Sequence, residues 1–391
     1  MSDQIYLDNS ATTRVRQEVL EAMLPYLSDQ AGNPSSLHAM GRQAAEAVAG
    51  AREQVARLLN CEADEIYFTP CGTYSNNTAI IGRARFAEAN GLGRHMITSR
   101  IEHPAVLGPA KYLESLGWRV DYLPVDREGL VSPADLERSI GPDTSLISIM
   151  WVNNEIGSVQ PLAALAAAAA GAGVYFHTDA VQAAGKLPVD VQRAEVSTLS
   201  LSGHKFHAPK GIGVLFARRG AGLMPIVFGG GQERGLFPGT QSVADIVAIG
   251  KAAELALAEL DENMISLRRM QQILMDKLLA VDGAQITGPR DPQKRLPGHL
   301  SLVLPGCRGE ALVMRADLKG VCISSGSACH KGIVEPSQVL LACGVADTDA
   351  LGSVRISAGR LNSVEECRKA ADLLLSAFLA CSRQASSRAP A

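Results

Sequence analysis

Apolar residues follow two different spacings along the first two thirds of the chain. A helical spacing of three or four residues runs through 14–27 and 41–59. Short runs that are apolar on both faces lie between the helical stretches, as is typical of strands in a parallel sheet that helices cover on both sides. These strand candidates are 65–70, 95–99, 119–125, 145–152, 174–179, 197–202 and 211–218. The alternation predicts a wound α/β domain.

The last third of the chain has a different pattern. One long helical pattern covers 243–281, and its length suggests a bridge between two domains. Strand candidates at 299–305, 321–325 and 353–357 then alternate with helical ones at 309–319 and 363–382, which predicts a smaller α+β domain. The division that we expect is a large domain over 16–257, a small domain over 1–15 and 258–382, and a disordered tail over 383–391.

Composition narrows the class of protein. The net charge of -3 gives no reason to expect binding to nucleic acid or to an anionic membrane. The first twenty residues lack a basic stretch followed by an apolar one, and the apolar tract 161–173 is too short to span a bilayer. The eight cysteines form no CxxC motif, so we expect free thiols in a reducing cytoplasm and no metal site.

Two strand candidates of the first domain end in side chains that can do chemistry. Asp179 ends the strand 174–179, and Lys205 follows the strand 197–202. Because ligands of α/β sheets bind where parallel strands end, both side chains belong to one candidate site. A lysine there can form a Schiff base, and a carboxylate can pair with the pyridinium nitrogen of pyridoxal phosphate. A solvated lysine and an aspartate that caps a helix are the simpler alternatives.

Other turns offer groups for a phosphate and for a substrate. Gly72 allows close approach of the backbone, and Thr73 with the following helix start supplies hydroxyl and N–H donors, although no GxxxxGK occurs in the chain. His103 lies at a strand-to-helix turn, where it either caps the helix or stacks on the cofactor ring. Arg355 is either a surface ion-pair partner or a fork for a substrate carboxylate.

One cysteine lies in an unusual setting. The stretch "SSGSACHKG" (324–332) places Cys329 among small residues, between Gly326 and Gly332, with His330 and Lys331 directly after it. A buried structural cysteine would have apolar neighbours instead. The glycines predict a loose segment that can swing, and adjacent cations favour the thiolate, which is the nucleophilic form. We therefore expect a reactive thiol that carries a group between a pocket and the outside.

Ten short motifs occur in the order found in one family, and the chain resembles NifS/IscS-type cysteine desulfurases nearly from end to end. The motifs are "YLDNSATT" (6–13), "NPSSLH" (33–38), "EHPAVL" (102–107), "VNNEIGSVQP" (152–161), "HTDAVQAAGK" (177–186), "SGHKFHAPKGIG" (202–213), "GGGQERG" (229–235), "SSGSAC" (324–329), "EPSQVL" (335–340) and "RISAGR" (355–360). The resemblance implies a fold-type I pyridoxal-phosphate enzyme of the class V aminotransferase family, with a mostly parallel seven-stranded sheet.

The resemblance also implies a role for individual side chains. Lys205 would carry the cofactor as a Schiff base, His103 would stack on its ring and move protons, and Cys329 would be the nucleophile. The other implied contacts are Asp179 on the ring nitrogen, Gln182 on the ring hydroxyl, Gly72, Thr73, Ser202 and His204 at the phosphate, Thr240 at the phosphate from a second subunit, Asn154 at the cofactor and the substrate carboxylate, Arg355 at that carboxylate, and Asn33 nearby.

The implied reaction removes sulfur from L-cysteine, which leaves L-alanine and a persulfide on Cys329. The sulfur then passes to an acceptor protein, in iron–sulfur cluster assembly or in another sulfur-transfer pathway. The resemblance implies a cytoplasmic homodimer, and we expect neither a membrane nor a nucleic acid among its partners.

Three stretches depart from the family pattern. "PCGTYS" (70–75) stands where the family commonly has "SGGTES" or "SGATES", so Cys71 and Tyr74 are new beside the retained Thr73. Phe237-Pro238 replaces an arginine and a small residue, and "HKG" after Cys329 replaces small and hydroxyl residues. We interpret Cys71 as a space-filling residue, and we hypothesise that His330 and Lys331 lower the pKa of Cys329.

Other functions remain open at this point. The departures fit a desulfurase dedicated to one pathway, such as DNA phosphorothioation, nitrogenase maturation or a biosynthetic route. A selenocysteine lyase shares the architecture, and its relatives also carry "ACH" at this cysteine. A general aminotransferase needs no thiol segment, and the presence of Lys205, Asp179 and Cys329 argues against a scaffold without catalytic activity.

Overall fold

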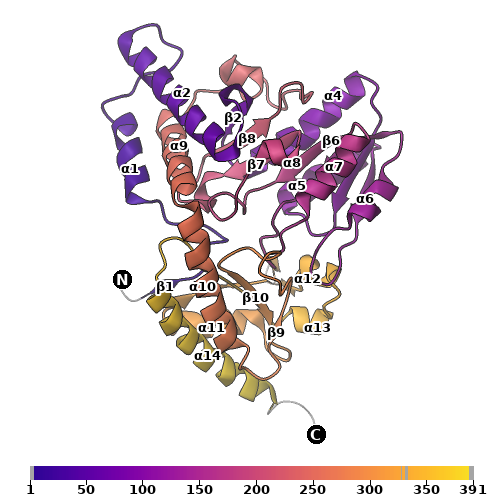
Figure 1. Cartoon of the computed structure of the whole chain (residues 1–391), viewed down its shortest axis with the longest axis vertical. Helices are drawn as coiled ribbons and strands as arrows, with labels where there is room; N and C mark the ends of the chain where they lie inside the picture. Colours follow the sequence, from indigo (N-terminus) through magenta and orange to yellow (C-terminus); the bar gives the residue numbers. More distant parts are fainter. Residues whose placement is uncertain (1–3, 327, 331–332, 387–391) are drawn as a thin grey trace.

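The protein consists of a larger and a smaller part, which lie one above the other in Figure 1. The structure is a computed structural model, and it describes residues 4–326, 328–330 and 333–386. Within these ranges, no helix combines the length and the apolar character that crossing a membrane requires.

A seven-stranded sheet forms the centre of the larger part, and the predicted sheet is therefore confirmed. Its strand order is β2-β8-β7-β6-β5-β3-β4. The strands are β2 (Ile66–Thr69), β3 (His95–Ser99), β4 (Arg119–Leu123), β5 (Thr144–Ser148), β6 (Tyr175–Asp179), β7 (Thr198–Ser202) and β8 (Gly213–Ala217). Only β8 is antiparallel to its neighbours β2 and β7, while the other pairs of this sheet are parallel.

Helices cover both faces of this sheet. They are α1 (Gln17–Met23), α2 (Ala39–Leu59), α3 (Gly72–Asn77), α4 (Arg83–Ala89), α5 (Pro104–Ser115), α6 (Pro133–Ser139), α7 (Leu162–Gly171), α8 (Val191–Ala194) and α9 (Val243–Ala258). Because neighbouring residues of a strand point to opposite faces, Phe176 packs in the core formed with α2, α7 and α9, whereas Tyr175 packs in the core with α4 and α5. Double coverage explains why these strands are apolar on both faces.

The smaller part has its own hydrophobic core. An antiparallel sheet of order β12-β15-β10-β9 and a parallel pair β1-β11 belong to this part, and α10, α11 and α14 contribute side chains to the core. The strands are β1 (Ile5–Tyr6), β9 (Gln285–Ile286), β10 (His299–Val303), β11 (Val321–Cys322), β12 (Ser324–Ser325) and β15 (Ser353–Ser357), and the helices are α10 (Leu260–Leu278), α11 (Gly309–Asp317), α12 (Gln338–Ala342), α13 (Asp347–Ala350) and α14 (Val364–Ser386).

Several predicted elements differ in detail from the observed ones. The pattern 243–281 forms two helices, α9 and α10, with Glu259 between them, and not one bridge. The pattern 321–325 forms two short strands in different sheets. The last helix continues to Ser386, so residues 383–386, which we expected in a disordered tail, are helical, and 387–391 lie outside the described residues.

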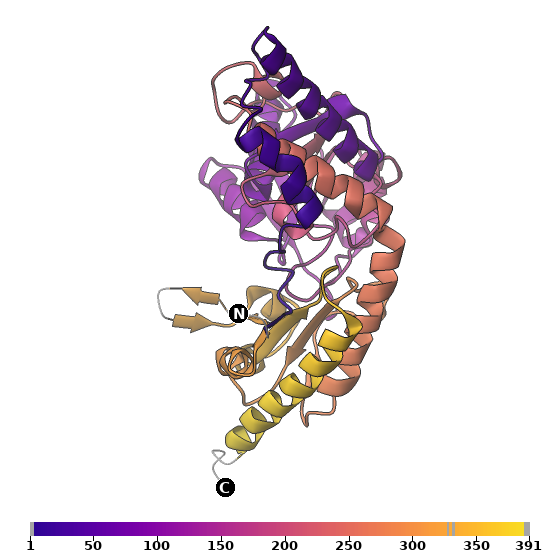
Figure 2. The same cartoon turned by 90° about the vertical axis from the view of Figure 1, so that its left-hand side faces the viewer.

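The segment expected to be a loose loop contains a β-hairpin. Strand β13 (Ala328–His330) pairs antiparallel with β14 (Ile333–Glu335), and Cys329 lies opposite Val334. The hairpin stands out to one side of the smaller part in Figure 2. The side chain of Cys329, and the predicted contributions of Lys331 and Gly332, lie outside the described residues.

Gly326, at the start of this segment, has a packing role that differs from the expected one. A Cβ atom at this position would lie 2.7 Å from Ser353 Oγ. Its backbone N–H also donates to the Ser353 carbonyl, at 3.3 Å. Close backbone approach to β15 therefore explains this glycine without any need for a swinging hinge.

Candidate active site

Most of the predicted site residues line one pocket at the carboxyl ends of β6 and β7. The predicted residues on its wall are Gly72, Thr73, His103, Asn154, Asp179, Gln182, Ser202, His204, Lys205 and Arg355. The pocket also contains Cys71, which the sequence placed next to Thr73 as a space-filling residue. Ser10, Ala11 and Asn76 line it as well, although sequence reasoning did not assign them to the site. The strand-end rule thus located the site, and three-dimensional packing added the residues from the N-terminal segment.

Lys205 lies in the short turn after β7, with its amine directed at the N-terminal segment. Its Nζ donates to the carbonyl oxygens of Ser10, at 2.7 Å, and Ala11, at 2.8 Å. Burial, followed by the nearby Arg355 guanidinium, lowers the pKa of Lys205 to about 8, although Asp179 and Asp8 oppose the shift. A larger share of neutral, nucleophilic amine at neutral pH is what Schiff-base formation requires.

Asp179 is the last residue of β6, and it is 5% exposed. Its Oδ1 accepts from the N–H of Val181, at 3.0 Å, and its Oδ2 accepts from Asn76 Nδ2, at 2.7 Å. The first contact resembles a helix cap, which was the simpler alternative that the sequence offered for Asp179. The second contact joins two side chains, and the sequence did not reveal it. Together they hold a carboxylate with unused acceptor capacity on the pocket wall.

His103 lies at the start of α5, as the strand-to-helix turn in the sequence predicted. It caps α5, because its Nδ1 accepts from the Ala105 N–H at 3.1 Å, and it also lines the pocket. Burial is the main cause that lowers the pKa of His103, Asp179 opposes this shift, and the Lys205 ammonium adds to it. The neutral imidazole that results can accept a proton.

The start of α3 forms another part of the pocket wall. A Cβ atom on Gly72 would lie 2.9 Å from Val181 Cγ2 and 3.3 Å from Ser202 Cβ, so only glycine brings the backbone this close. His204 lies across the pocket, with its Nδ1 3.1 Å from Thr12 Oγ1. Burial, and then Lys205, lowers the pKa of His204 to about 4, so its imidazole is neutral at physiological pH.

Arg355 contributes a guanidinium group to the pocket wall. Its Nη2 lies 2.9 Å from Asp8 Oδ1, and its Nη1 donates to the Asn154 carbonyl at 3.1 Å. Its buried Nε has no hydrogen-bond partner within the described residues, and the same is true of Ser10 Oγ. Asp8 therefore orients the guanidinium and leaves a donor unused, which is the arrangement expected of a fork that binds a carboxylate.

Asn33 and Thr240 do not line this pocket. Asn33 is exposed, and its Oδ1 accepts from the Ser35 N–H. Thr240 is also exposed and lines a separate pocket together with Pro70, Tyr74 and Phe237. Two of the three departures from the family pattern thus meet around one cavity, next to the residue expected to serve a second subunit.

Pyridoxal phosphate fits the residues that are present. The pocket offers an amine of lowered pKa, a buried carboxylate on the neighbouring strand end and a glycine-cradled helix start. The unpartnered Ser10 Oγ and Arg355 Nε are buried polar atoms, and such atoms normally have partners. A cofactor and its substrate would supply acceptors that the protein alone does not.

Comparisons with known proteins assign the chain to a family. The model of the family described as aminotransferase class-V matches residues 5–369, so the chain belongs to this family. It is 46% identical over 362 residues to the cysteine desulfurase IscS of Methanosarcina thermophila, which covers 93% of this chain and 89% of the relative. It is 44% identical over 375 residues to the IscS of Dictyoglomus turgidum, with 96% and 94% covered.

Solved structures agree with this assignment. A NifS-like protein superposes with a TM-score of 0.89 at 38% identity, covering 95% of this chain and 98% of that one. A structure described as SspA in complex with cysteine has a TM-score of 0.79 at 37% identity, with 90% and 98% covered. The predicted family and fold are confirmed, and members of this family use pyridoxal phosphate.

Proposed function

We propose that this protein is a pyridoxal-phosphate-dependent cysteine desulfurase that converts L-cysteine to L-alanine and leaves the sulfur as a persulfide on Cys329. The observation that carries the proposal is the pocket in which Lys205 lies with Asp179 and Arg355. Similarity to cysteine desulfurases over more than nine tenths of the chain supports it, and so does a solved relative described in complex with cysteine.

The proposed division of labour follows from the chemistry of each group. The cofactor, when bound, supplies an electron sink for the carbanion that forms at the substrate Cα. Asp179 would pair with its ring nitrogen, and Arg355 would bind the substrate carboxylate through its unused Nε–H. Lys205, once its amine is released, takes the proton from Cα and later returns one to the product.

Sulfur transfer needs a thiolate and a proton acceptor. The Cys329 thiolate attacks the substrate sulfur, so a sulfur–sulfur bond forms while the carbon–sulfur bond breaks, and its electron pair stays with the substrate carbon. Protonation of that carbon skeleton yields alanine. The neutral imidazole of His103 accepts a proton from the substrate in the pocket.

Further parts of the proposal concern partners. A homodimer would bring Thr240 of one subunit to the phosphate site of the other, and Asn33 would lie near the substrate in that assembly. An acceptor protein would collect the sulfur in the cytoplasm. Residues 16–257 would form the cofactor-binding domain, and 1–15 with 258–382 the domain that carries Cys329.

The test is incubation of the protein with L-cysteine and pyridoxal phosphate, with alanine and protein-bound persulfide measured together. We expect both products in equal amounts in the first turnover. Cys329→Ser should abolish the persulfide, and Lys205→Ala should abolish the alanine. Failure of the unmodified protein to form either product would exclude the proposal. Parallel turnover of selenocysteine separates a desulfurase from a selenocysteine lyase.

A further inference from the structure

A chain of buried polar side chains extends from Asp179 into the interior of the larger part. Asn76 Nδ2 lies 2.7 Å from Asp179 Oδ2, and Asn76 Oδ1 lies 2.9 Å from His177 Nε2. His177 Nδ1 lies 2.8 Å from Thr198 Oγ1, which in turn lies 2.6 Å from the Tyr175 hydroxyl. No member of this chain, which we call the Asp179 relay, is more than 5% exposed.

Strand geometry explains how the relay is assembled. Tyr175, His177 and Asp179 alternate along β6, so all three side chains point to one face of the sheet. Thr198 begins β7 and is paired with His177 across the two strands. Asn76 comes from α3 and reaches the same face, where both Asn76 and Asp179 line the cofactor pocket. The relay therefore ends at the pocket wall.

Only one set of proton positions satisfies the contacts from Asp179 as far as Thr198 when Asp179 is ionised. A carboxylate only accepts, so Asn76 must present its NH₂ group to Asp179 and its oxygen to His177. That oxygen requires the N–H of His177 Nε2. Burial lowers the pKa of His177 to about 3, so the ring is neutral and its Nδ1 has a free lone pair.

The outer half of the relay completes this order. The His177 Nδ1 lone pair accepts the hydroxyl proton of Thr198, at 2.8 Å. Thr198 Oγ1 also lies 2.6 Å from the Tyr175 hydroxyl, whose single proton can go either to Thr198 or to the Ala79 carbonyl at 3.0 Å. The Thr198 hydroxyl proton and the His177 ring proton thus point toward the carboxylate, and each donor strengthens the next one.

We propose that Asn76, His177 and Thr198 are positioning residues that hold Asp179 ionised and keep the shared proton on the ring nitrogen of bound pyridoxal phosphate. The inference rests on the proposed function and goes beyond it, because it assigns a task to side chains that the proposed reaction does not use. Asp179 and the ring nitrogen compete for one proton. Hydrogen bonds donated to a carboxylate lower its proton affinity, so the proton stays on the ring.

The alternative is that these side chains only fill space. Buried polar groups are costly unless every one is paired, and apolar residues would fill the same volume without that cost. The test must therefore separate the hydrogen bond from the packing. Thr198 provides the matched pair, since Thr198→Val keeps the shape and removes the donor to His177, whereas Thr198→Ser keeps the donor and removes a methyl group.

The experiment measures the ¹⁵N chemical shift of the ring nitrogen in holoenzyme reconstituted with ¹⁵N-labelled pyridoxal phosphate. We expect a protonated ring in the unmodified protein and in Thr198→Ser. Thr198→Val should increase the unprotonated fraction about twofold, and Asn76→Leu, which removes the direct donor, by roughly tenfold, equivalent to one pKa unit. Thr198→Ala, which also removes the hydroxyl donor, replaces Thr198→Val in the comparison if the valine variant binds no cofactor.

The outcomes are distinct. Equal ring shifts in Thr198→Val and Thr198→Ser would overturn the relay. If both shifts are altered, packing decides the result; if both are unchanged, the Thr198 donor has no influence on the ring proton. An unprotonated ring in the unmodified holoenzyme would overturn it as well. If the unmodified protein instead yields neither alanine nor persulfide, the proposed function fails. The product assay detects this failure independently of the ¹⁵N measurement.

Discussion

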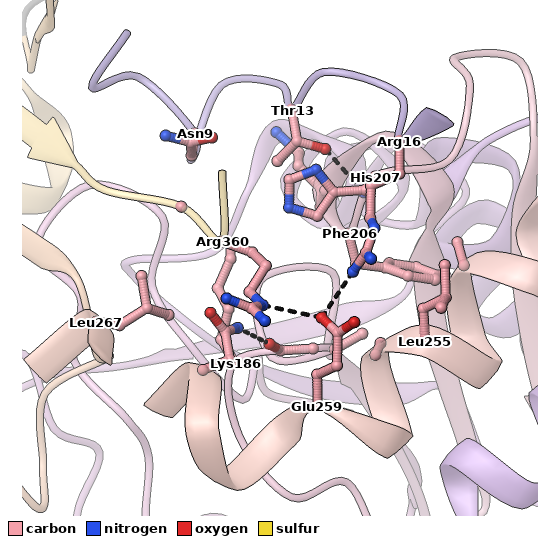
Figure 3. A pocket seen from close by; sticks show the side chains of 17 residues that line it. Asn9, Thr13, Arg16, Lys186, Phe206, His207, Leu255, Glu259, Leu267 and Arg360 are labelled. Carbon is pink, nitrogen blue, oxygen red and sulfur yellow. Dashed lines mark hydrogen bonds and ion pairs between the residues drawn. The ribbon is translucent and has the colours of Figure 1, made fainter. Parts of the chain in front are cut away.

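Lys186 is a buried cation next to the cofactor pocket. It is 7% exposed, and its Nζ donates to Gln182 Oε1 at 3.1 Å. Among the described residues no carboxylate forms an ion pair with it, and Figure 3 shows it on the wall of a neighbouring pocket. Gln182 Nε2 donates to the Ser10 carbonyl, so the amide nitrogen of Gln182 faces Ser10 and its amide oxygen faces Lys186.

Replacement of Lys186 by methionine should therefore change stability in a pH-dependent manner. Burial, followed by Lys205 and Arg355, lowers the pKa of Lys186 to about 7. Below that pH both folded and unfolded states carry the charge, and the folded state bears the full cost of burying it. Between about 7 and 10.4 only the unfolded state stays protonated, so the cost disappears as pH rises.

The measured quantity is the free energy of unfolding of Lys186→Met relative to the unmodified protein. The free energy of unfolding of the variant, relative to that of the unmodified protein, should be roughly 2–4 kcal/mol higher at pH 6.5 than at pH 10. Lys210→Met, at an exposed position, is the control and should show no such pH trend. A pH-independent difference for Lys186→Met would contradict a buried, charged lysine.

Asp8 should influence the reactivity of Lys205 through charge. Asp8 is one of the groups that raise the pKa of Lys205. Asp8 also forms an ion pair with Arg355, and the Arg355 guanidinium lowers the pKa of Lys205. Asp8→Asn removes the favourable charge, so the pH midpoint for reaction of Lys205 with an amine reagent should fall by about half a unit. The measurement is trinitrophenylation of cofactor-free protein, with Lys205→Ala as the background, and Asp8→Glu should restore the midpoint.

The residues of the site differ in how far they could be predicted. Asp179 and Lys205 follow directly from strand ends, because a strand and the turn after it are local features. Asp8 could not be assigned, since it meets Arg355 across 347 positions of sequence. Asn76 and His177 are separated by 101 positions, and only the register of the sheet brings them together.

At the scale of elements, the hairpin with Cys329 is fixed at the point where β14 leads into α12. Ser337 caps α12 by accepting from the Leu340 N–H, and it donates to Glu155 Oε2 at 2.5 Å. Glu155 directly follows Asn154, whose carbonyl accepts from Arg355. The base of the hairpin is thus tied to the loop whose Asn154 carbonyl accepts from Arg355.

Ser337→Asp should disturb this attachment while it preserves the helix cap. An aspartate still accepts from the Leu340 N–H, but it faces the Glu155 carboxylate and repels it. We expect formation of the Cys329 persulfide in a single turnover to slow by about tenfold, or 1.4 kcal/mol in barrier height. The spectral change on cysteine binding should keep its midpoint, because neither Ser337 nor Glu155 lines the pocket.

Ser337→Asn is the matched control for this prediction. Its amide can both accept from the Leu340 N–H and donate to Glu155, so its rate should stay near that of the unmodified protein. The pair Ser337→Asp with Glu155→Gln should also recover most of the rate. Equal rates for the aspartate and asparagine variants would show that the attachment does not position the hairpin.

Element prediction failed where tertiary contacts outweigh local pattern. The run 243–281 is helical throughout by periodicity, and nothing local in it predicts the break at Glu259. The glycine-rich stretch around Cys329 has weak strand propensity, yet β13 and β14 pair with each other. In both places the chain is shaped by its neighbours more than by its own composition.

At the scale of the whole molecule, the break between α9 and α10 is also the meeting point of three distant segments. Glu259 lies between Arg16, which precedes α1, and Arg360, which follows β15, as Figure 3 shows. Its Oε2 is 2.6 Å from Arg16 Nη1 and 2.8 Å from Arg360 Nε. One carboxylate thus links the N-terminal segment, the helix break and the smaller part.

Glu259→Gln should loosen this junction at neutral pH and have little effect in acid. The Arg16 guanidinium, the largest cause, lowers the pKa of Glu259, and its effect exceeds the opposing one of burial. A carboxylate whose pKa is lowered by folding adds stability above its unfolded pKa, and this stability is lost as pH falls through the folded pKa.

We expect the Tm of Glu259→Gln to fall by roughly 2–4 °C at pH 7, with the difference shrinking below pH 4. Glu262→Gln is the control, because that side chain is 73% exposed and lies 3.4 Å from Arg360, so its Tm should match that of the unmodified protein. Equal effects of the two substitutions would mean that Glu259 contributes no more to the junction than a surface charge does.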